Sequence, residues 1–172
     1  MRSLRKYSLT PLALLALSGL LPLFVAAQDR ATVLTGAALT RVVPPGFYYQ
    51  GQTAPTQLRN AAAARFGNKS YVIAGMVDTS GYSADIRASY EGFFITDSAI
   101  TINGTRLGVG AYGFGSTNDG KLKILDLAGN EILSVSGTKD NQMKRPRPLM
   151  MTEAGNVIRL YLGKYYVSVD AK

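Results

Sequence analysis

The chain ends in a run of alternating side chains, Val157-Ile158-Arg159-Leu160-Tyr161-Leu162-Gly163-Lys164-Tyr165-Tyr166-Val167-Ser168-Val169. Apolar residues occupy every second position on each side of Gly163-Lys164, and this period of two is typical of strands with one buried face. Arg159 and Tyr161 fall on the opposite face of the first strand. The run therefore predicts an antiparallel hairpin whose buried face consists of Ile158, Leu160, Leu162, Tyr165, Val167 and Val169.

Upstream of this hairpin, from Ser70 onward, short β-rich segments alternate with turns. Asn103-Gly104 is a strong signal for a two-residue hairpin turn, and Ser116-Thr117-Asn118-Asp119-Gly120 has the composition of another turn. Alternating apolar residues also predict a long strand over residues 82–96. Six or more such strands predict an all-β fold, an antiparallel meander that forms a small barrel or a sandwich.

One short helix is predicted near residues 56–66. Pro55 suits the first turn of a helix, four consecutive alanines favour helical structure, and Gly67 supplies a residue that commonly ends a helix. Leu58, Ala62 and Phe66 lie four residues apart, which places them on one apolar stripe. Before this segment, residues 31–43 are apolar with scattered threonines and are interpreted as a strand that stops at Pro44-Pro45-Gly46.

The first 27 residues have the pattern of a cleaved export signal. Arg2, Arg5 and Lys6 precede an apolar run, and Val25-Ala26-Ala27 offers the small residues that signal peptidases require. A retained membrane anchor is the alternative, but Pro22 interrupts a run that is short for a membrane span. We expect a signal at 1–27, a partly irregular leading segment at 28–54 and a single β-rich domain at 55–172. The protein would then be periplasmic or secreted, with no membrane span after cleavage.

The composition narrows the chemistry that the chain can perform. The chain contains no His, Cys or Trp, which excludes Ser-His-Asp and Cys-His catalytic systems and zinc sites built from Cys and His. The formal charge of +8 falls to +5 when the three basic residues of the signal are removed. A modest positive charge favours anionic polymers over other partners. We expect no enzyme activity, no cofactor and no metal.

The segment Gly108-Val109-Gly110-Ala111-Tyr112-Gly113 matches the G-x-G-x-x-G pattern of dinucleotide-binding proteins. That function requires a preceding strand and a helix that begins within the motif. A turn follows here instead, so we interpret the segment as a glycine-rich hairpin in which missing side chains allow close packing.

Two groups of residues are candidates for contact with a ligand or partner. Tyrosines present a ring face and a hydroxyl to ligands, although tyrosine is also a common half-buried strand residue. The basic loop around Pro146 is a second candidate, against the alternative of an ordinary solvated loop. It lacks interleaved aromatic residues, so we expect no specific nucleic-acid binding. The candidate residues are Tyr48, Tyr49, Tyr90, Tyr112, Tyr161, Lys144, Arg145 and Arg147.

Several segments resemble small exported bacterial single-domain proteins of unknown function. The similar segments are Gly46-Phe47-Tyr48-Tyr49-Gln50-Gly51-Gln52-Thr53-Ala54-Pro55-Thr56-Gln57, Tyr90-Glu91-Gly92-Phe93-Phe94, Gly104-Thr105-Arg106-Leu107-Gly108-Val109-Gly110-Ala111-Tyr112-Gly113-Phe114-Gly115, Arg145-Pro146-Arg147-Pro148-Leu149 and Arg159-Leu160-Tyr161-Leu162-Gly163. The resemblance implies an exported single domain and supplies no catalytic residue.

The sequence therefore predicts a non-enzymatic exported β-domain with a binding or structural role in the cell envelope. Its partner would be an anionic envelope polymer, a small apolar ligand or a protein. One alternative is a lipocalin-like carrier of a small apolar ligand, which needs a large internal cavity. Another is a carboxylate-based hydrolase acting on an envelope or extracellular polymer, which needs two acids that converge in one cleft.

Overall fold

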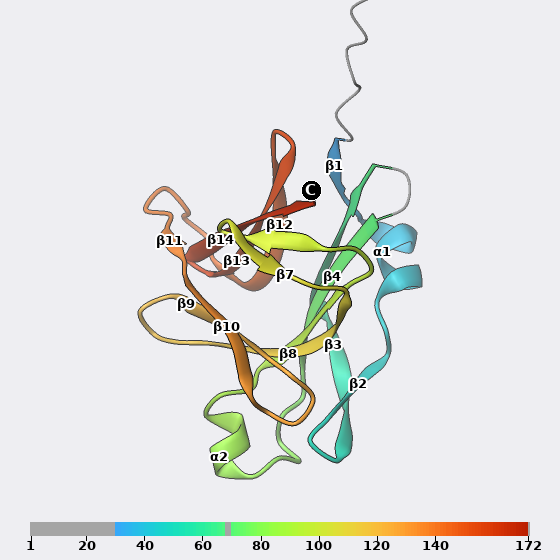
Figure 1. Cartoon of the computed structure of the whole chain (residues 1–172), viewed down its shortest axis with the longest axis vertical. Coiled ribbons are helices and arrows are strands. Elements are labelled where there is room, and N and C mark those ends of the chain that lie inside the picture. Colours follow the sequence, from blue (N-terminus) through green and yellow to red (C-terminus); the bar gives the residue numbers. More distant parts are fainter. Residues whose placement is uncertain (1–29, 68–69, 172) are drawn as a thin grey trace, which may run out of the picture.

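The computed structural model describes residues 30–67 and 70–171, so the expected export signal at 1–27 lies outside the described residues. The predicted all-β class is confirmed. The described strands form two antiparallel sheets that face each other as a sandwich rather than one closed barrel (Figure 1). No helix among the described residues is long and apolar enough to cross a membrane.

The first sheet has eight strands, which lie between residues 31 and 136. Its strands are antiparallel neighbours, and the β2 strand (Gly46–Tyr49) pairs with one half of β3 outside the main path. The order along the sheet is β1 (Ala31–Val33), β3 (Gln52–Phe66), β4 (Ser70–Val77), β5 (Gly92–Thr96), β8 (Gly110–Ser116), β9 (Lys121–Leu125) and β10 (Glu131–Ser136).

The second sheet has six strands and contains the predicted C-terminal hairpin. Leu160 pairs with Val167 and Ile158 with Val169, and all four side chains are buried as the alternating pattern predicts. Asn103 (φ 48°) and Gly104 (φ 82°) form the expected tight turn between two further strands of this sheet. The order is β12 (Arg147–Ala154), β13 (Val157–Gly163), β14 (Tyr165–Ala171), β6 (Ile100–Ile102) and β7 (Thr105–Leu107), with β11 (Thr138–Lys139) beside β14.

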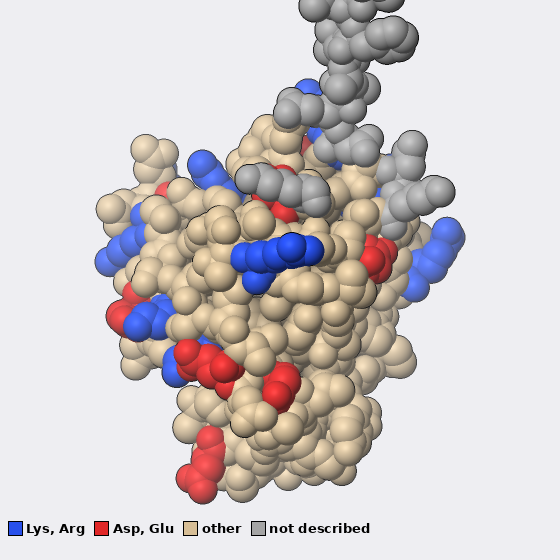
Figure 2. Space-filling model, in the orientation of Figure 1, with Lys and Arg blue, Asp and Glu red and all other residues tan. Residues whose placement is uncertain are grey.

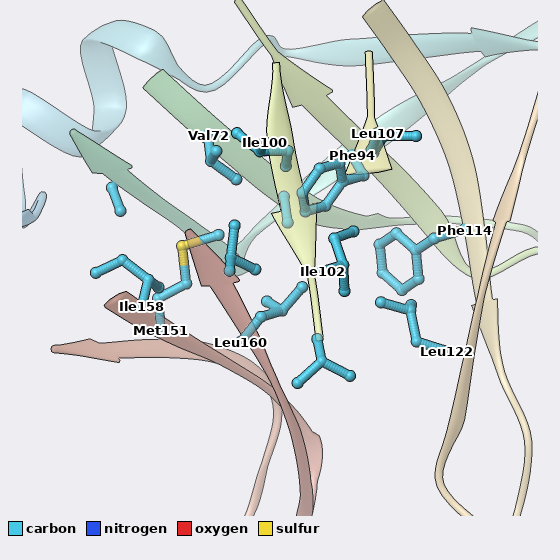
Figure 3. Close-up of a cluster of buried hydrophobic side chains, with 14 of the residues drawn as sticks. Val72, Phe94, Ile100, Ile102, Leu107, Phe114, Leu122, Met151, Ile158 and Leu160 are labelled. Atoms are coloured by element: carbon cyan, nitrogen blue, oxygen red, sulfur yellow. The ribbon is translucent and has the colours of Figure 1, made fainter. Parts of the chain in front are cut away.

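Between the sheets lies the larger of two hydrophobic clusters, which we call the aliphatic cluster. It takes side chains from the inner faces of both sheets, and most of them are branched aliphatic residues (Figure 3). The side chains fill the space between the layers, as expected for a close-packed core. Its larger members include Val72, Phe94, Ile100, Ile102, Leu107, Phe114, Leu122, Ile124, Leu149, Met151, Ile158 and Leu160.

The opposite, outer face of the first sheet carries the second cluster, which we call the aromatic cluster. The β2–β3 hairpin and the connection that contains the α2 helix (Ala84–Arg87) cover this face (Figure 1). The first sheet is therefore buried on both faces over part of its area. The buried members are Val43, Phe47, Tyr49, Ala54, Ala61, Val77, Tyr82, Tyr90, Phe93 and Leu125.

The predicted helix near 56–66 is wrong, because these residues belong to the long β3 strand. Ala62 and Ala64 face the aliphatic cluster and Ala61 faces the aromatic cluster, so small side chains are buried on both sides of the strand. The α1 helix (Gly36–Val42) also contacts β3. Tertiary packing on two faces therefore overrides the helical preference of the alanine run.

A register shift interrupts β3 in the middle of this segment. Thr56 pairs with Val77, whereas the next paired residue, Ala61, lies opposite Gly75. The extra residues form a bulge, in which the Gln57 side-chain amide donates to the Val77 carbonyl over 3.0 Å. The bulge interrupts the pairing of β3 with β4 between Thr56 and Ala61.

Two strand predictions also need correction. Residues 82–96 contain a turn, the short α2 helix and the five-residue β5 strand, because Ser83 accepts a capping hydrogen bond from the Ile86 amide. Residues 31–43 form β1 and then α1 rather than one strand. Gly36 has φ 54° at the start of α1, where the chain leaves the sheet.

Candidate functional site

A hollow of about 540 Å³ opens at the edge of the sandwich where the two sheets separate, and we call it the cleft. Met76 and Leu162 form its apolar base and pack against the aliphatic cluster. The first sheet supplies one wall, and the second sheet with the loop before β12 supplies the other. The lining residues are Met76, Glu91, Ser116, Thr117, Asn118, Lys139, Pro146, Pro148, Leu162, Gly163, Lys164 and Tyr165.

Glu91 places a carboxyl group in this cleft, directly before β5. Its backbone is fixed between two strands, because the Glu91 amide donates to the Phe114 carbonyl and the Glu91 carbonyl accepts from the Val77 amide. The Ser116 hydroxyl donates to Glu91 Oε2 over 2.9 Å. Burial raises the pKa of Glu91, and the Ser116 hydrogen bond opposes that shift. Glu91 is the only carboxylate among the residues that line the cleft.

The turn between β8 and β9 forms the polar part of the wall. The Gly120 amide donates to the Thr117 carbonyl over 2.8 Å, and the Thr117 amide donates to the Lys121 carbonyl over 3.0 Å. The Thr117 hydroxyl also donates to the Asp119 carboxylate, which lowers the pKa of Asp119. These bonds hold the turn in one conformation and leave the Asn118 side chain exposed at its tip.

Tyr165 supplies an aromatic wall whose position depends on a glycine. Gly120 has φ 83°, and a Cβ atom at this position would lie 2.1 Å from the Tyr165 ring. Gly137 lies on the other side, where an added Cβ would be 3.2 Å from Tyr165 Cβ. The two glycines allow the ring to lie against the backbone, and its contacts restrict the orientations that it can take.

Two cationic side chains line the cleft, and two more lie on the loop that forms part of its wall. Lys139 and Lys164 line it, while Lys144 and Arg145 are exposed on the loop whose prolines, Pro146 and Pro148, also line it. Within the described residues, none of these four cations lies within ion-pair distance of a carboxylate, whereas Lys123 and Glu131 form an ion pair of 2.9 Å elsewhere. The positive charges around the cleft are therefore available to an external anion.

The structure distributes the predicted tyrosines over separate environments. Tyr49 stacks on Tyr90 with ring centroids 3.9 Å apart, and both are buried in the aromatic cluster. Tyr161 is buried on the second sheet, where its hydroxyl donates to Asp140 Oδ2 over 3.0 Å. Tyr112 is half-buried and donates to the Gly108 carbonyl. The predicted tyrosines do not share one surface, and only Tyr48 among them is largely exposed, at 54%.

The exposed Tyr48 lies on an uncharged part of the surface. Residues 42–58 contain no Asp, Glu, Lys or Arg, and Figure 2 shows no charged side chain over the β2–β3 hairpin in this view. Elsewhere in the same view, positive and negative side chains are interspersed. The hairpin surface therefore lacks the charge that would attract an anionic ligand.

The predicted basic loop is brought only partly into the site. Lys144 and Arg145 lie on its exposed part, whereas the Arg147 guanidinium turns to the other side of β12 and donates to the Arg59 carbonyl over 3.4 Å. Sequence reasoning did not single out Glu91, Ser116 or Lys164 as site residues. The turns at 116–120 and 163–164 were both predictable, but no pattern in the sequence indicated that they lie beside each other.

The glycine-rich segment that matches G-x-G-x-x-G, residues 108–113, runs into the first half of strand β8, and the β8–β9 turn follows the strand. An added Cβ at Gly113 would lie 2.6 Å from the Tyr49 ring, and one at Gly115 would lie 2.0 Å from the Ser89 carbonyl oxygen. The glycines therefore allow the covering segments to approach the sheet closely, as the hairpin interpretation expected.

The described residues contain no group of three or more Asp and Glu side chains placed to hold a metal ion. Comparison of the chain with protein-family models, curated proteins and solved structures gives no match. The functional argument therefore rests on the geometry of the cleft.

Proposed function

We propose that this protein is an exported, non-catalytic binding domain that holds a segment of an anionic envelope polymer in the cleft. The observation that carries the proposal is that Lys139 and Lys164 line one hollow and form no ion pair in the described part of the chain. Lys144 and Arg145, which also form none there, lie on the loop that contributes Pro146 and Pro148 to the same hollow. An anion in the cleft would meet several of these charges at once.

The remaining lining suits a polymer of anionic sugars. Tyr165 offers a fixed ring face for an apolar sugar surface, and Asn118 and Thr117 offer polar groups at the level of the rim. Pro146 and Pro148 keep the facing loop extended, so that this wall has few internal degrees of freedom. The cleft therefore combines charge, hydrogen-bonding groups and an aromatic surface.

Other parts of the molecule support the proposal over the alternatives. The aliphatic cluster fills the space between the sheets, so the large hollow lies at their edge, where a long polymer has access from solvent. The cleft holds one carboxyl group, whereas hydrolysis by paired acids requires two. Export itself is proposed from residues 1–27 and is tested by N-terminal sequencing of the protein after expression, with cleavage after Ala27 as the expected result.

The binding test uses a fluorescent sulfated dextran oligosaccharide as the probe and unsulfated dextran as its neutral control. The double variant Lys139→Ala/Lys164→Ala should bind the probe about two- to thirtyfold more weakly, since each exposed ion pair contributes about 0.2–1 kcal/mol. Arg41→Ala/Arg106→Ala is the matched control, because it removes the same charge from exposed positions that do not line the cleft.

Fluorescence anisotropy at low and high salt completes this test. Binding through the cleft should weaken as salt screens the charges, and the control double variant should bind almost as tightly as the unmodified protein. Equal losses in the two double variants would show that the probe responds to net charge alone and would contradict a site in the cleft. Equal binding of neutral dextran would contradict an anionic ligand.

A further inference from the structure

Glu91 stands out because it puts a carboxyl group inside a cleft whose other charged lining residues, Lys139 and Lys164, are both positive. It is held by the backbone of two strands and by the Ser116 hydroxyl, so it cannot easily move away from a ligand. An anionic group bound beside an ionised carboxylate would be repelled, and the repulsion is stronger in a partly buried site than in water. A proton on Glu91 removes this conflict.

Resting on the proposed function, we infer that Glu91 is a specificity-determining residue that binds ligand in its neutral form and donates a hydrogen bond to a ligand oxyanion. Ser116 donates to Oε2 of Glu91, which leaves Oε1 to carry the proton. A carboxylic acid offers one donor, whereas a carboxylate offers none. Binding of the anion would therefore take up one proton, which is transferred from the buffer to Glu91.

The groups that face Glu91 are consistent with this assignment. Ser116 and Thr117 come from β8 and the turn that follows it, Met76 comes from β4, and Lys139, Lys164 and Tyr165 come from the opposite wall. Asp119 lies on the same turn as Thr117, but Thr117 donates to its carboxylate and lowers its pKa. Within the described residues, no cation forms an ion pair with Glu91. Burial, which raises the pKa of Glu91, is thus not offset by a direct ion pair.

The composition makes the pH dependence easy to assign. The whole chain contains no His and no Cys, the two side chains whose ordinary pKa values lie closest to neutral pH. Sulfate half-esters on the dextran probe stay ionised over the range tested, so the ligand does not titrate. A change in affinity between about pH 5 and about pH 8 would then come from a carboxyl group with a raised pKa or from the α-amino group, and the Glu91→Gln variant distinguishes the two.

The test measures the affinity of the purified protein for sulfated dextran across this pH range, at constant ionic strength. The unmodified protein should bind more weakly as the pH rises, by up to about tenfold per pH unit above the pKa of Glu91. Glu91→Gln keeps the shape of the side chain and its acceptor for Ser116, and it should bind with an affinity that does not change with pH. Calorimetry in two buffers of different ionisation enthalpy should show proton uptake for the unmodified protein only.

A second variant keeps the inference testable if Glu91→Gln does not fold. Ser116→Ala removes a hydrogen bond that favours ionised Glu91, so the fall in affinity should begin at a higher pH than in the unmodified protein. Constant affinity from about pH 5 to about pH 8 in the unmodified protein would overturn the inference and leave the proposed function standing. The same pH dependence in Glu91→Gln would also overturn it. Absence of binding at every pH would overturn both proposals.

Discussion

The two faces of the first sheet are both buried, but they are built in different ways. The inner face presents alanine, phenylalanine and branched aliphatic side chains, which pack against the mainly branched aliphatic side chains of the second sheet. On the outer face, aromatic rings and covering backbone lie against glycines, as Phe93 lies over Gly75 and Tyr49 lies over Gly113. A sheet can therefore be covered by a second sheet through side-chain packing, or by a hairpin and a loop if glycines allow them to approach.

Phe93 and Phe94 give the most direct way to compare the two faces, because they are neighbours on β5 and neither is exposed to solvent. Phe94 belongs to the aliphatic cluster, and Phe93 stacks on Phe47 with centroids 5.2 Å apart in the aromatic cluster. We expect Phe94→Ala and Phe93→Ala each to reduce the free energy of unfolding by about 3–5 kcal/mol. Urea denaturation measures the free energy of unfolding of each variant. A decrease below about 1 kcal/mol for Phe93→Ala would show that the aromatic cluster is not a second core.

The next prediction tests the close approach that glycine allows on the outer face. A Cβ atom at Gly115 would lie 2.0 Å from the Ser89 carbonyl oxygen, which is backbone and cannot rotate away. Gly115→Ala should therefore destabilise the fold by about 1–3 kcal/mol. Gly108→Ala is the matched control, since the nearest atom would be Tyr112 Oη at 3.8 Å, and thermal denaturation should show little change. Equal stability of the two variants would refute the role of close approach.

Two hydroxyl groups in the aromatic cluster sharpen the comparison further. The Tyr82 hydroxyl donates to the Tyr49 and Gln52 carbonyls, each over 3.1 Å. The Tyr90 hydroxyl is buried near the Tyr82 hydroxyl but forms no hydrogen bond of regular geometry with any described residue. Burial, together with the neighbouring Tyr82 and Tyr49, raises the pKa of Tyr90. Tyr82→Phe should cost about 1–2 kcal/mol, whereas Tyr90→Phe should be neutral within about 0.5 kcal/mol or stabilising. Chemical denaturation measures the free energy of unfolding of both variants. A larger decrease for Tyr90→Phe than for Tyr82→Phe would contradict the hydrogen bonding described above.

The smallest expected effect lies at the cleft, where the inner face ends in a carboxyl group instead of an apolar side chain. Because the pKa of Glu91 is higher in the folded than in the unfolded chain, its stabilising contribution is complete at low pH and is lost as the pH rises through the folded-state value. Glu91→Gln should therefore gain thermal stability relative to the unmodified protein as the pH rises above the ordinary range of a glutamate carboxyl group. Parallel melting curves, with a constant difference at all pH values, would contradict the burial of Glu91.

The sequence predicted the strands of the C-terminal hairpin, which have one buried face, and failed at β3, which is buried on two. It also missed the short helices α1 and α2, which contain no buried residue. The alternation of apolar residues in β13 and β14 identified side chains that are buried in the aliphatic cluster. Asn103-Gly104 predicted a turn because the two residues favour the backbone conformation that the turn requires. The alanines of β3 carry no alternation because both sides of the strand are covered. Their helical preference is a local property, whereas the two covering layers come from distant parts of the chain.

The cleft was not predictable for a related reason. Glu91, Lys139 and Tyr165 each follow a local pattern that fits an ordinary strand or turn. They meet only because β5, β11 and β14 end at the same edge of the sandwich. Burial at that edge, which raises the pKa of Glu91, depends on two sheets that no short stretch of sequence specifies.

The most direct test of the cleft as the binding site is a titration of the isotope-labelled protein with the sulfated dextran oligosaccharide, followed by amide chemical shifts. The proposed site predicts the largest changes at the β8–β9 turn and at the facing wall of the second sheet. Changes confined to the uncharged β2–β3 hairpin around Tyr48, or no changes at all, would contradict it. The amides expected to shift most are those of Thr117, Asn118, Lys139, Lys164 and Tyr165.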